Sequence, residues 1–391
     1  PTTPPADEWS LWVDGTHLRG ANIYQRRVFD ELDEGFLGPG PLGPPYTQAD
    51  FDALAAAGAN YVNLSVPGLF TVQPPYEPDP DVVATVDRLL EMAASADLYV
   101  VLSARTGPLR SEFSILRDGA GDWFGYEYLI EKVWEDTEAQ AAWAAMWRYT
   151  AERYRDNPIV IGYDLMVEPN SNDILDIWDP DEFYRQYGGT TYDWNTWYPP
   201  IVQAIREVDP DTPILVGGMG YSGLEWLPYL QPVDDPRVVY TFHQYEPFVY
   251  THQEPGEGLT NTYPGRFDAD WDEEAEDVNR AWLDSFFALG DLYAAQYGVP
   301  LAVNECGVMR WEPGAADFMR DQLDLFERRG WNVAVWMWYP DWPPLATPDG
   351  DHDFNFRFGP DPANLTPTSN DLFAVYREFW SHNTLRPSGR R

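Results

Sequence analysis

Positive charge is scarce in this chain. Its 391 residues carry 25 Lys and Arg against 64 Asp and Glu, a formal net charge of −39 at pH 7, and Lys132 is the only lysine. Because nucleic-acid phosphates require a cationic surface, the composition argues against a nucleic-acid partner, and an anionic membrane surface is disfavoured for the same reason. The acidity predicts a well-solvated surface, of the kind that suits high salt, without naming a function.

Cysteine and long apolar runs are scarce as well. Cys306 is the only cysteine, which excludes an internal disulfide, and no run of about 18 apolar residues is available for membrane insertion. Residues 1–6 resemble the remnant of a Pro/Thr linker, so we expect a secreted or cell-surface protein. What the chain does have is a 16% aromatic content that includes 18 Trp, which excludes disorder.

Short apolar, β-rich runs alternate with amphipathic helical stretches along the chain. The runs are residues 17–23, 60–66, 98–103, 160–167, 214–217, 238–242, 301–304 and 333–338. The helices expected among them are residues 50–57, 82–94, 138–155, 197–208, 275–297, 315–329 and 371–382. This alternation predicts a single closed (β/α)8 barrel. An open doubly wound sheet is the alternative, but its Gly-rich phosphate-binding turn is missing after the first strand.

We expect one barrel domain at residues 11–386, between a tail or linker remnant at 1–10 and a short tail at 387–391, and a monomer. Asp14-Gly15 lies between residues 11–13 and the first strand and predicts an N-terminal β-hairpin. Extended loops follow the first strand, at 24–47, and the sixth, at 244–274. In such barrels these loops gather on the C-terminal face, where active sites are built.

Two glutamates follow strands on that face. Glu168, fixed by Pro169, ends the fourth strand and Glu305 ends the seventh. Two carboxylates across one barrel mouth can cleave a glycosidic bond, and in a retaining mechanism they stand about 5 to 5.5 Å apart. At that distance an ionised Glu305 should raise the pKa of Glu168 and keep it protonated. Spacing alone leaves the alternative that each is a solvated loop acid.

The residues around these glutamates form a series of motifs: YDLMVEPN at 163–170, YTFHQYEPFVYTHQ at 240–253 and LAVNECG at 301–307, followed by a strand that ends in Trp336 and Trp338. The series resembles the glycoside hydrolases of clan A, most closely family 5, which contains many cellulases and β-mannanases. The resemblance covers nearly the whole chain, although only the last five strands carry specific motifs.

The resemblance implies a role for each matching residue. Glu168 corresponds to the acid/base and Glu305 to the nucleophile. His243 and Tyr245 correspond to the pair after strand six, where the Tyr hydroxyl bonds the nucleophile. Trp336 corresponds to the floor under the reacting sugar, with Trp338 as a second candidate.

Three positions depart from the family pattern. Val167 replaces the Asn before the acid/base, Asn63 replaces an Arg of strand two, and Arg105 replaces a His of strand three. Arg105 could supply the positive charge lost from strand two and hold Glu305 ionised. Alternatively, the site is retuned to a sugar without the usual 2-hydroxyl contact, or catalysis is lost and only binding remains. Because both carboxylates are present, we favour an active, divergent enzyme.

Other residues give weaker signals. His252 could line the same site or cap a loop. Residues 349–353 (DGDHD) lack the Gly and the final acid of an EF-hand loop, so a cation there is left open. The histidines show no metal spacing, and we expect no metal or cofactor. Cys306 is expected to be a buried thiol. Tryptophans that could form sugar subsites are Trp178, Trp194, Trp197, Trp311, Trp336, Trp338 and Trp342.

The sequence therefore predicts a retaining β-glycoside hydrolase that acts on a β-linked glucan, mannan or related oligosaccharide through two glutamates. Two alternatives remain at this point. One is a catalytically impaired barrel that only binds carbohydrate, suggested by Val167, Asn63 and Arg105. The other is a transglycosylase, in which an aromatic acceptor site outcompetes water.

Overall fold

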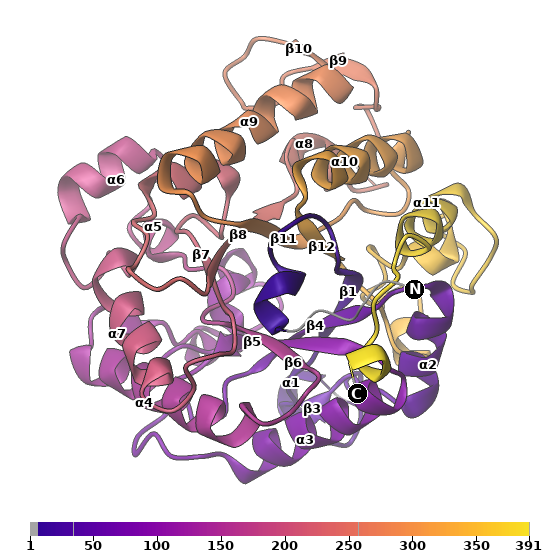
Figure 1. The fold of residues 1–391 in the computed structure, drawn as a ribbon. Coiled ribbons are helices and arrows are strands. Elements are labelled where there is room, and N and C mark those ends of the chain that lie inside the picture. The colour runs from indigo at the N-terminus through magenta and orange to yellow at the C-terminus, as the bar shows by residue number, and fades with distance from the viewer. Residues whose placement is uncertain (1–6, 34, 257, 391) are drawn as a thin grey trace.

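The computed structural model describes residues 7–33, 35–256 and 258–390, and it contains a closed barrel of parallel strands in the spatial order β1-β12-β11-β8-β7-β6-β5-β4 (Figure 1). The barrel strands are β1 (Arg19–Tyr24), β4 (Tyr61–Pro67), β5 (Tyr99–Thr106), β6 (Val160–Asp164), β7 (Ile214–Gly217), β8 (Val238–Gln244), β11 (Leu301–Cys306) and β12 (Asn332–Val335). The predicted (β/α)8 barrel is confirmed.

Helices surround the strands in Figure 1. The longer ones are α2 (Gln48–Ala57), α3 (Pro80–Ser95), α4 (Thr137–Tyr154), α6 (Pro180–Tyr187), α7 (Trp194–Arg206), α9 (Arg280–Tyr297), α10 (Ala315–Arg329) and α11 (Asp371–Trp380). Between β7 and β8 the chain forms only a 3-10 helix, Leu224–Tyr229. Short elements in the loops are α1 (Asp30–Asp33), α5 (Ser171–Ile174), α8 (Phe248–Thr251) and the strand pairs β2 (Arg26–Arg27) with β3 (Leu42–Gly43) and β9 (Gly265–Phe267) with β10 (Glu276–Val278).

The helix ends follow from local sequence signals. Asp136 caps α4 by accepting hydrogen bonds from two main-chain N–H groups of its first turn. Asn279 does the same for α9, so this helix begins at Arg280 and not at the predicted residue 275. Gly298 and Gly330 then end α9 and α10 in the left-handed conformation that glycine adopts without steric cost.

The predicted N-terminal hairpin is wrong. Residues Glu8–Leu11 form a 3-10 helix, and no strand precedes β1 among the described residues. Leu11 and Trp12 are buried in a cluster with inward-facing strand residues such as Val101, and the Trp12 indole donates to the Ile161 carbonyl at 2.9 Å. A barrel needs apolar side chains to close its lower end, which explains why this apolar segment packs as a plug over the centre of the ring in Figure 1.

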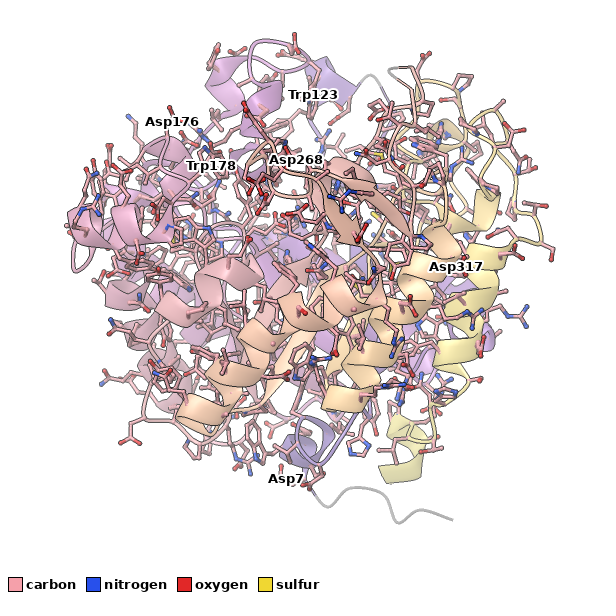
Figure 2. The ribbon with its side chains drawn as sticks, turned by 90° about the horizontal axis from the view of Figure 1, so that it is seen from above. Asp7, Trp123, Asp176, Trp178, Asp268 and Asp317 are labelled. Atoms are coloured by element: carbon pink, nitrogen blue, oxygen red, sulfur yellow. The ribbon has the colours of Figure 1, made fainter. Side chains whose placement is uncertain are left out.

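Long loops cover the other end of the barrel. The loops predicted after β1 and β8 are present, and those at 107–136, 165–193 and 336–370, after β5, β6 and β12, are comparably long. Figure 2 shows Asp7 at the plugged end and Trp123, Trp178 and Asp268 at the opposite end. No helix of the described chain is long and apolar enough to cross a membrane. The structure does not describe residues 1–6, where the sequence suggests a linker remnant.

Candidate active site

The two glutamates predicted from the sequence come together at the C-terminal ends of the strands. Glu168 follows β6 and Glu305 lies in β11, and their side chains are buried, with relative exposures of 8% and 5%. One oxygen of each carboxylate and Nδ1 of His243 lie within 4.8 Å of one another. This spacing is that of two carboxylates that act on one bond, although the same three atoms could also hold a metal ion.

His243 in β8 and Tyr245, two residues later at the start of the following loop, orient the pair. His243 Nδ1 lies 2.8 Å from Oε1 of Glu168 and 3.8 Å from Oε2 of Glu305. The Tyr245 hydroxyl donates to Oε1 of Glu305 at 2.8 Å. Each carboxylate therefore has its own hydrogen-bond partner, and Oε2 of Glu305 is left free of the tyrosine.

The pKa values of the two carboxyl groups shift in opposite directions. Burial acts to raise the pKa of Glu168, but the hydrogen bond and positive charge of His243 outweigh it and hold that pKa below its usual value. Burial, with the negative charge of Glu168, raises the pKa of Glu305 although His243 opposes the shift. The order is the reverse of the one predicted from spacing, because the close contact of His243 is with Glu168.

A network of polar side chains supports the carboxylates from inside the barrel. Asn63 donates to Asn22 at 2.7 Å and to the main-chain oxygen of Asn304, the residue before Glu305, at 3.2 Å. The single O–H of Ser103 lies within hydrogen-bond distance of side-chain oxygens of both Asn63 and Asp164. Asn63 thus fixes the backbone beside Glu305 by hydrogen bonds, where the family pattern has a charged Arg. Burial raises the pKa of Asp164 to about 6.

Arg105 extends from the end of β5 between two aromatic rings. Its guanidinium lies 4.8 Å from the ring centre of Tyr24 and 5.3 Å from that of Trp336, and Nη1 donates to the Ser65 hydroxyl at 2.9 Å. The side chain is 6% exposed, and its Nε has no hydrogen-bond partner among the described residues. Its positive charge acts to lower the pKa of both glutamates. The structure therefore brings Arg105 and Trp336 to the site.

Comparison with known families identifies the chain. The family model described as "Cellulase (glycosyl hydrolase family 5)" matches residues 32–341, which is most of the chain. The chain belongs to glycoside hydrolase family 5.

Named relatives agree with this family. Endoglucanase C of Acetivibrio thermocellus is 27% identical over 237 residues, 57% of this chain and 59% of that protein. Cellodextrinase A of Ruminococcus flavefaciens is 25% identical over 227 residues, 57% of each chain. These matches span less than two thirds of the relatives' own length. Among solved structures, endoglucanase Cel5A of Thermotoga maritima has the same fold, with a TM-score of 0.62 at 20% identity over 85% of this chain and 93% of that one.

Other predicted residues of this family 5 chain occupy different places. Trp338 lies in the core, where its indole donates to the Asp50 carbonyl at 3.0 Å, so it does not form the floor of the site. His252 stacks on Phe248 with ring centres 3.9 Å apart and also contacts Tyr245 edge-on at 5.3 Å. Burial lowers the pKa of His252 to about 3, so this ring is neutral at working pH.

The remaining tryptophans divide between core and surface. Trp194 and Trp197 are buried against each other with ring centres 4.5 Å apart, and Trp311 is buried with its indole on the Gln253 carbonyl. Trp342 is half-buried, whereas Trp178 is 57% exposed. Of the group proposed for sugar subsites, Trp178, Trp336 and Trp342 are therefore the ones whose rings are not buried in the core.

Two clusters of acidic residues lie in the loops outside the site. In the loop at 349–353, Asp351 accepts from the Tyr339 hydroxyl at 3.1 Å, and no potential metal-binding group is found in this loop as described. Asp268, Asp270 and Glu276 place one oxygen each within 4.8 Å of one another near the β9-β10 pair, an arrangement common among exposed acids.

Arg110 is a residue of the site that no motif in the sequence marks. This arginine is fully buried, and its guanidinium donates to the main-chain oxygens of Arg105 at 2.9 Å, Val167 at 2.8 Å and Glu168 at 2.7 Å. Glu168 itself has a φ of 55°, a conformation that is uncommon outside glycine and needs support from its surroundings. Arg110 provides that support from a loop 58 residues earlier in the chain.

Proposed function

We propose that this family 5 chain is a retaining β-glycoside hydrolase that acts on a β-linked glucan, mannan or related oligosaccharide. The observation that carries the proposal is the pair of buried carboxylates, Glu168 and Glu305, with oxygens within 4.8 Å at the mouth of the barrel. This is the short separation of retaining enzymes, because an inverting enzyme must leave room for a water between its carboxylates. The names of the matched relatives, endoglucanases and a cellodextrinase, favour a β-glucan.

In the proposed mechanism Glu305 attacks the anomeric carbon. Tyr245 holds Oε1 of Glu305, so Oε2 forms the new bond to carbon while the bond to the leaving oxygen breaks. Glu168 transfers a proton to that oxygen as it departs. In the second step Glu168 takes a proton from water, the water oxygen bonds to the anomeric carbon, and Glu305 is released as a carboxylate.

The His243 hydrogen bond explains how a glutamate of lowered pKa can act as the acid. A proton on His243 Nδ1 and a proton on Oε1 of Glu168 are two positions along one 2.8 Å contact, and the net charge is the same in both. The two negative charges nearby raise the pKa of His243 and keep this proton in the site. As the leaving oxygen develops negative charge, the proton moves to it through Glu168.

The trapping of the glycosyl group by azide tests both roles. We expect Glu305→Ala, given azide and a 2,4-dinitrophenyl β-glycoside, to form the α-glycosyl azide, because azide attacks in place of the nucleophile. Glu168→Ala should instead form the β-azide from the glycosyl-enzyme. Glu246→Gln, which alters a half-buried carboxylate on the same loop as Tyr245, is the control and should give hydrolysis without azide product. Parental hydrolysis of a phenyl β-glycoside, without azide, by either alanine variant would contradict the proposal.

The departures at Val167 and Arg105 keep a carbohydrate-binding barrel as a second candidate. Calorimetric binding of an oligosaccharide, with no product after long incubation of the wild type, would favour it.

We also propose that the protein is secreted or on the cell surface, because polymeric β-glucans are met outside the cell. Appearance of the full-length natural protein in the culture medium of its source would support that location.

A further inference from the structure

A layer of buried polar side chains lies inside the barrel, on strand positions that precede the two catalytic glutamates. This inner polar layer consists of Asn22, Asn63, Ser103, Asp164 and Asn304, from β1, β4, β5, β6 and β11, with relative exposures from 0% to 3%. Asp164 is the one member that can ionise. A carboxylate so far from water is costly unless its neighbours stabilise the charge or it carries a proton.

Ser103 places its single hydroxyl hydrogen between two acceptors. Its Oγ lies 2.7 Å from Oδ1 of Asn63 and 2.8 Å from Oδ2 of Asp164. Asn63 must face Ser103 with its oxygen, because its amide nitrogen donates to Asn22 and to the main-chain oxygen of Asn304. One hydrogen cannot serve both contacts, so the second hydrogen bond requires a proton on Asp164.

The inner polar layer accommodates both charge states of Asp164 by turning this hydroxyl. When Asp164 is protonated, its O–H donates to Ser103 and Ser103 donates to Asn63. When Asp164 is ionised, Ser103 turns to the carboxylate, and the same carboxylate oxygen accepts from Nδ2 of Asn304 at 2.8 Å. Burial raises the pKa of Asp164 to about 6, although the Ser103 hydrogen bond and the charge of His243 oppose the shift. Asp164 is therefore neutral below about pH 6 and negative above it.

The charge of Asp164 acts on His243 of the catalytic pair. Burial acts to lower the pKa of His243, but nearby negative charges outweigh it and raise that pKa. These charges are Glu305, which lies opposite His243 on β11, Glu168 after β6, and Asp164 on β6. The residues paired with Asp164 on the adjacent strands are uncharged, Ser103 on β5 and Leu215 on β7. Arg105, farther along β5, acts on the two glutamates.

We propose that Asp164 is a positioning residue that keeps the acid proton in the His243–Glu168 pair as the pH rises above neutral. Asp164 is 1% exposed, so it acts on the substrate only through His243. Its negative charge appears above about pH 6, in the range where the proton would otherwise be lost. The inference rests on the proposed hydrolase function, and it extends the active pH range on the alkaline side.

The test removes the charge and keeps the shape. Asp164→Asn has no charge at any pH, and its amide N–H groups can donate to Ser103 and to Oδ1 of Asn304, which has no partner among the described residues. We expect the basic limb of the kcat/KM profile to move to lower pH by at least about 0.5 pH unit. The acid limb should move less, because Asp164 is already neutral there in the wild type. Ser103→Ala removes a hydrogen bond that favours the ionised form, so it should move the basic limb in the same direction by a smaller amount.

Nuclear magnetic resonance gives a second readout that does not depend on turnover. In protein labelled with carbon-13 histidine, the Cε1 signal of His243 is assigned by its loss in His243→Gln. This signal should titrate at lower pH in Asp164→Asn than in the wild type. Glu312→Gln is the matched control, because Glu312 is also buried and burial raises its pKa to about 7, but it accepts from Gln253 in the loop after β11. It should shift neither readout.

Two results would overturn the role of Asp164. One is a basic limb and a His243 titration that both stay in place in Asp164→Asn, even if the rate falls at every pH, because that is what a purely structural role gives. The other is an equal shift in Glu312→Gln. If the wild type hydrolyses no glycoside while His243 still titrates at lower pH in Asp164→Asn, it is the hydrolase function that fails.

Discussion

The buried guanidinium of Arg110 donates through Nη2 to the main-chain oxygen of Glu168 at 2.7 Å. The same side chain also binds the carbonyls of Arg105 and Val167, and it is 0% exposed. Burial lowers the pKa of Arg110 to about 10, which still leaves the group charged at neutral pH. Arg110 thus joins the ends of β5 and β6 and holds Glu168 in its left-handed conformation.

We expect Arg110→Met to impair proton donation by Glu168 more than it impairs nucleophilic attack. Phenyl β-glycosides need an acid to release phenol, whereas 2,4-dinitrophenyl β-glycosides do not, and general acid catalysis contributes about 10²- to 10⁴-fold. The variant should lose at least about tenfold more kcat/KM on the phenyl substrate.

Arg310→Met is the control for simple loss of structure. Arg310 is also a buried arginine that donates to main-chain carbonyls, those of Gly359 and Asp361, in the loop after β12. Its loss should affect both substrates alike. If Arg110→Met also slows both substrates equally, its role is structural and the positioning of the acid has another cause.

The pH profile of kcat/KM should have an acid limb set by Glu305 and a basic limb set by the proton that His243 shares with Glu168. Activity needs Glu305 ionised, and its pKa lies above the ordinary value, so the acid limb should fall above about pH 4.5. Activity also needs the proton shared by His243 and Glu168. The pKa of His243 is raised above its ordinary value of about 6.5. The proton is retained below this raised pKa and lost above it, so the basic limb should lie above about pH 6.5.

His243→Gln should move the acid limb to higher pH. The neutral amide removes the positive charge that opposes the upward shift of the Glu305 pKa, so Glu305 becomes protonated at a higher pH. The profiles are measured as kcat/KM from pH 4 to 9 in buffers of constant ionic strength. An acid limb that stays in place would show that His243 does not act electrostatically on Glu305.

The catalytic side chains at the ends of the strands were predictable from the sequence, because each of them is marked by the short apolar segment that precedes it. Glu168, His243 and Glu305 each follow an apolar run, and parallel strands of a barrel end on one face, so the sequence brings them together without further information. It was harder to predict which of Trp336 and Trp338 lies at the site. β12 ends at Val335, so the alternation of side chains that would place both on one face no longer applies.

Tertiary contacts were not predictable in this way. Arg110 acts on residues 57 and 58 positions later, and nothing in its local sequence marks it. The reversed pKa order of the glutamates likewise depends on whether His243 lies 2.8 Å from one or from the other. The hairpin prediction failed because a turn signal at Asp14-Gly15 is equally compatible with a plug that enters the barrel.

Arg105→Met should shift the acid limb in the same direction as His243→Gln. The charge of Arg105 lowers the pKa of Glu305, so removing it raises that pKa, while the methionine keeps an apolar stem between Tyr24 and Trp336. Arg105→Lys retains a charge and should return the acid limb most of the way to its wild-type position. A limb unchanged in Arg105→Met, with only KM increased, would assign Arg105 to substrate binding alone.

The net charge of −39 should make the fold more stable as salt is added. Like charges repel across the surface, and the Debye length falls from about 30 Å at 0.01 M to about 10 Å at 0.1 M salt. Salt also weakens exposed ion pairs such as Arg320–Glu378, but such pairs contribute only about 0 to 1 kcal/mol each. We expect the thermal unfolding midpoint to rise mainly below about 0.1 M NaCl. Sucrose, which acts by exclusion and not by screening, should give no such early rise. A midpoint that is flat or falling from 0.01 to 0.1 M NaCl would show that self-repulsion does not limit this fold.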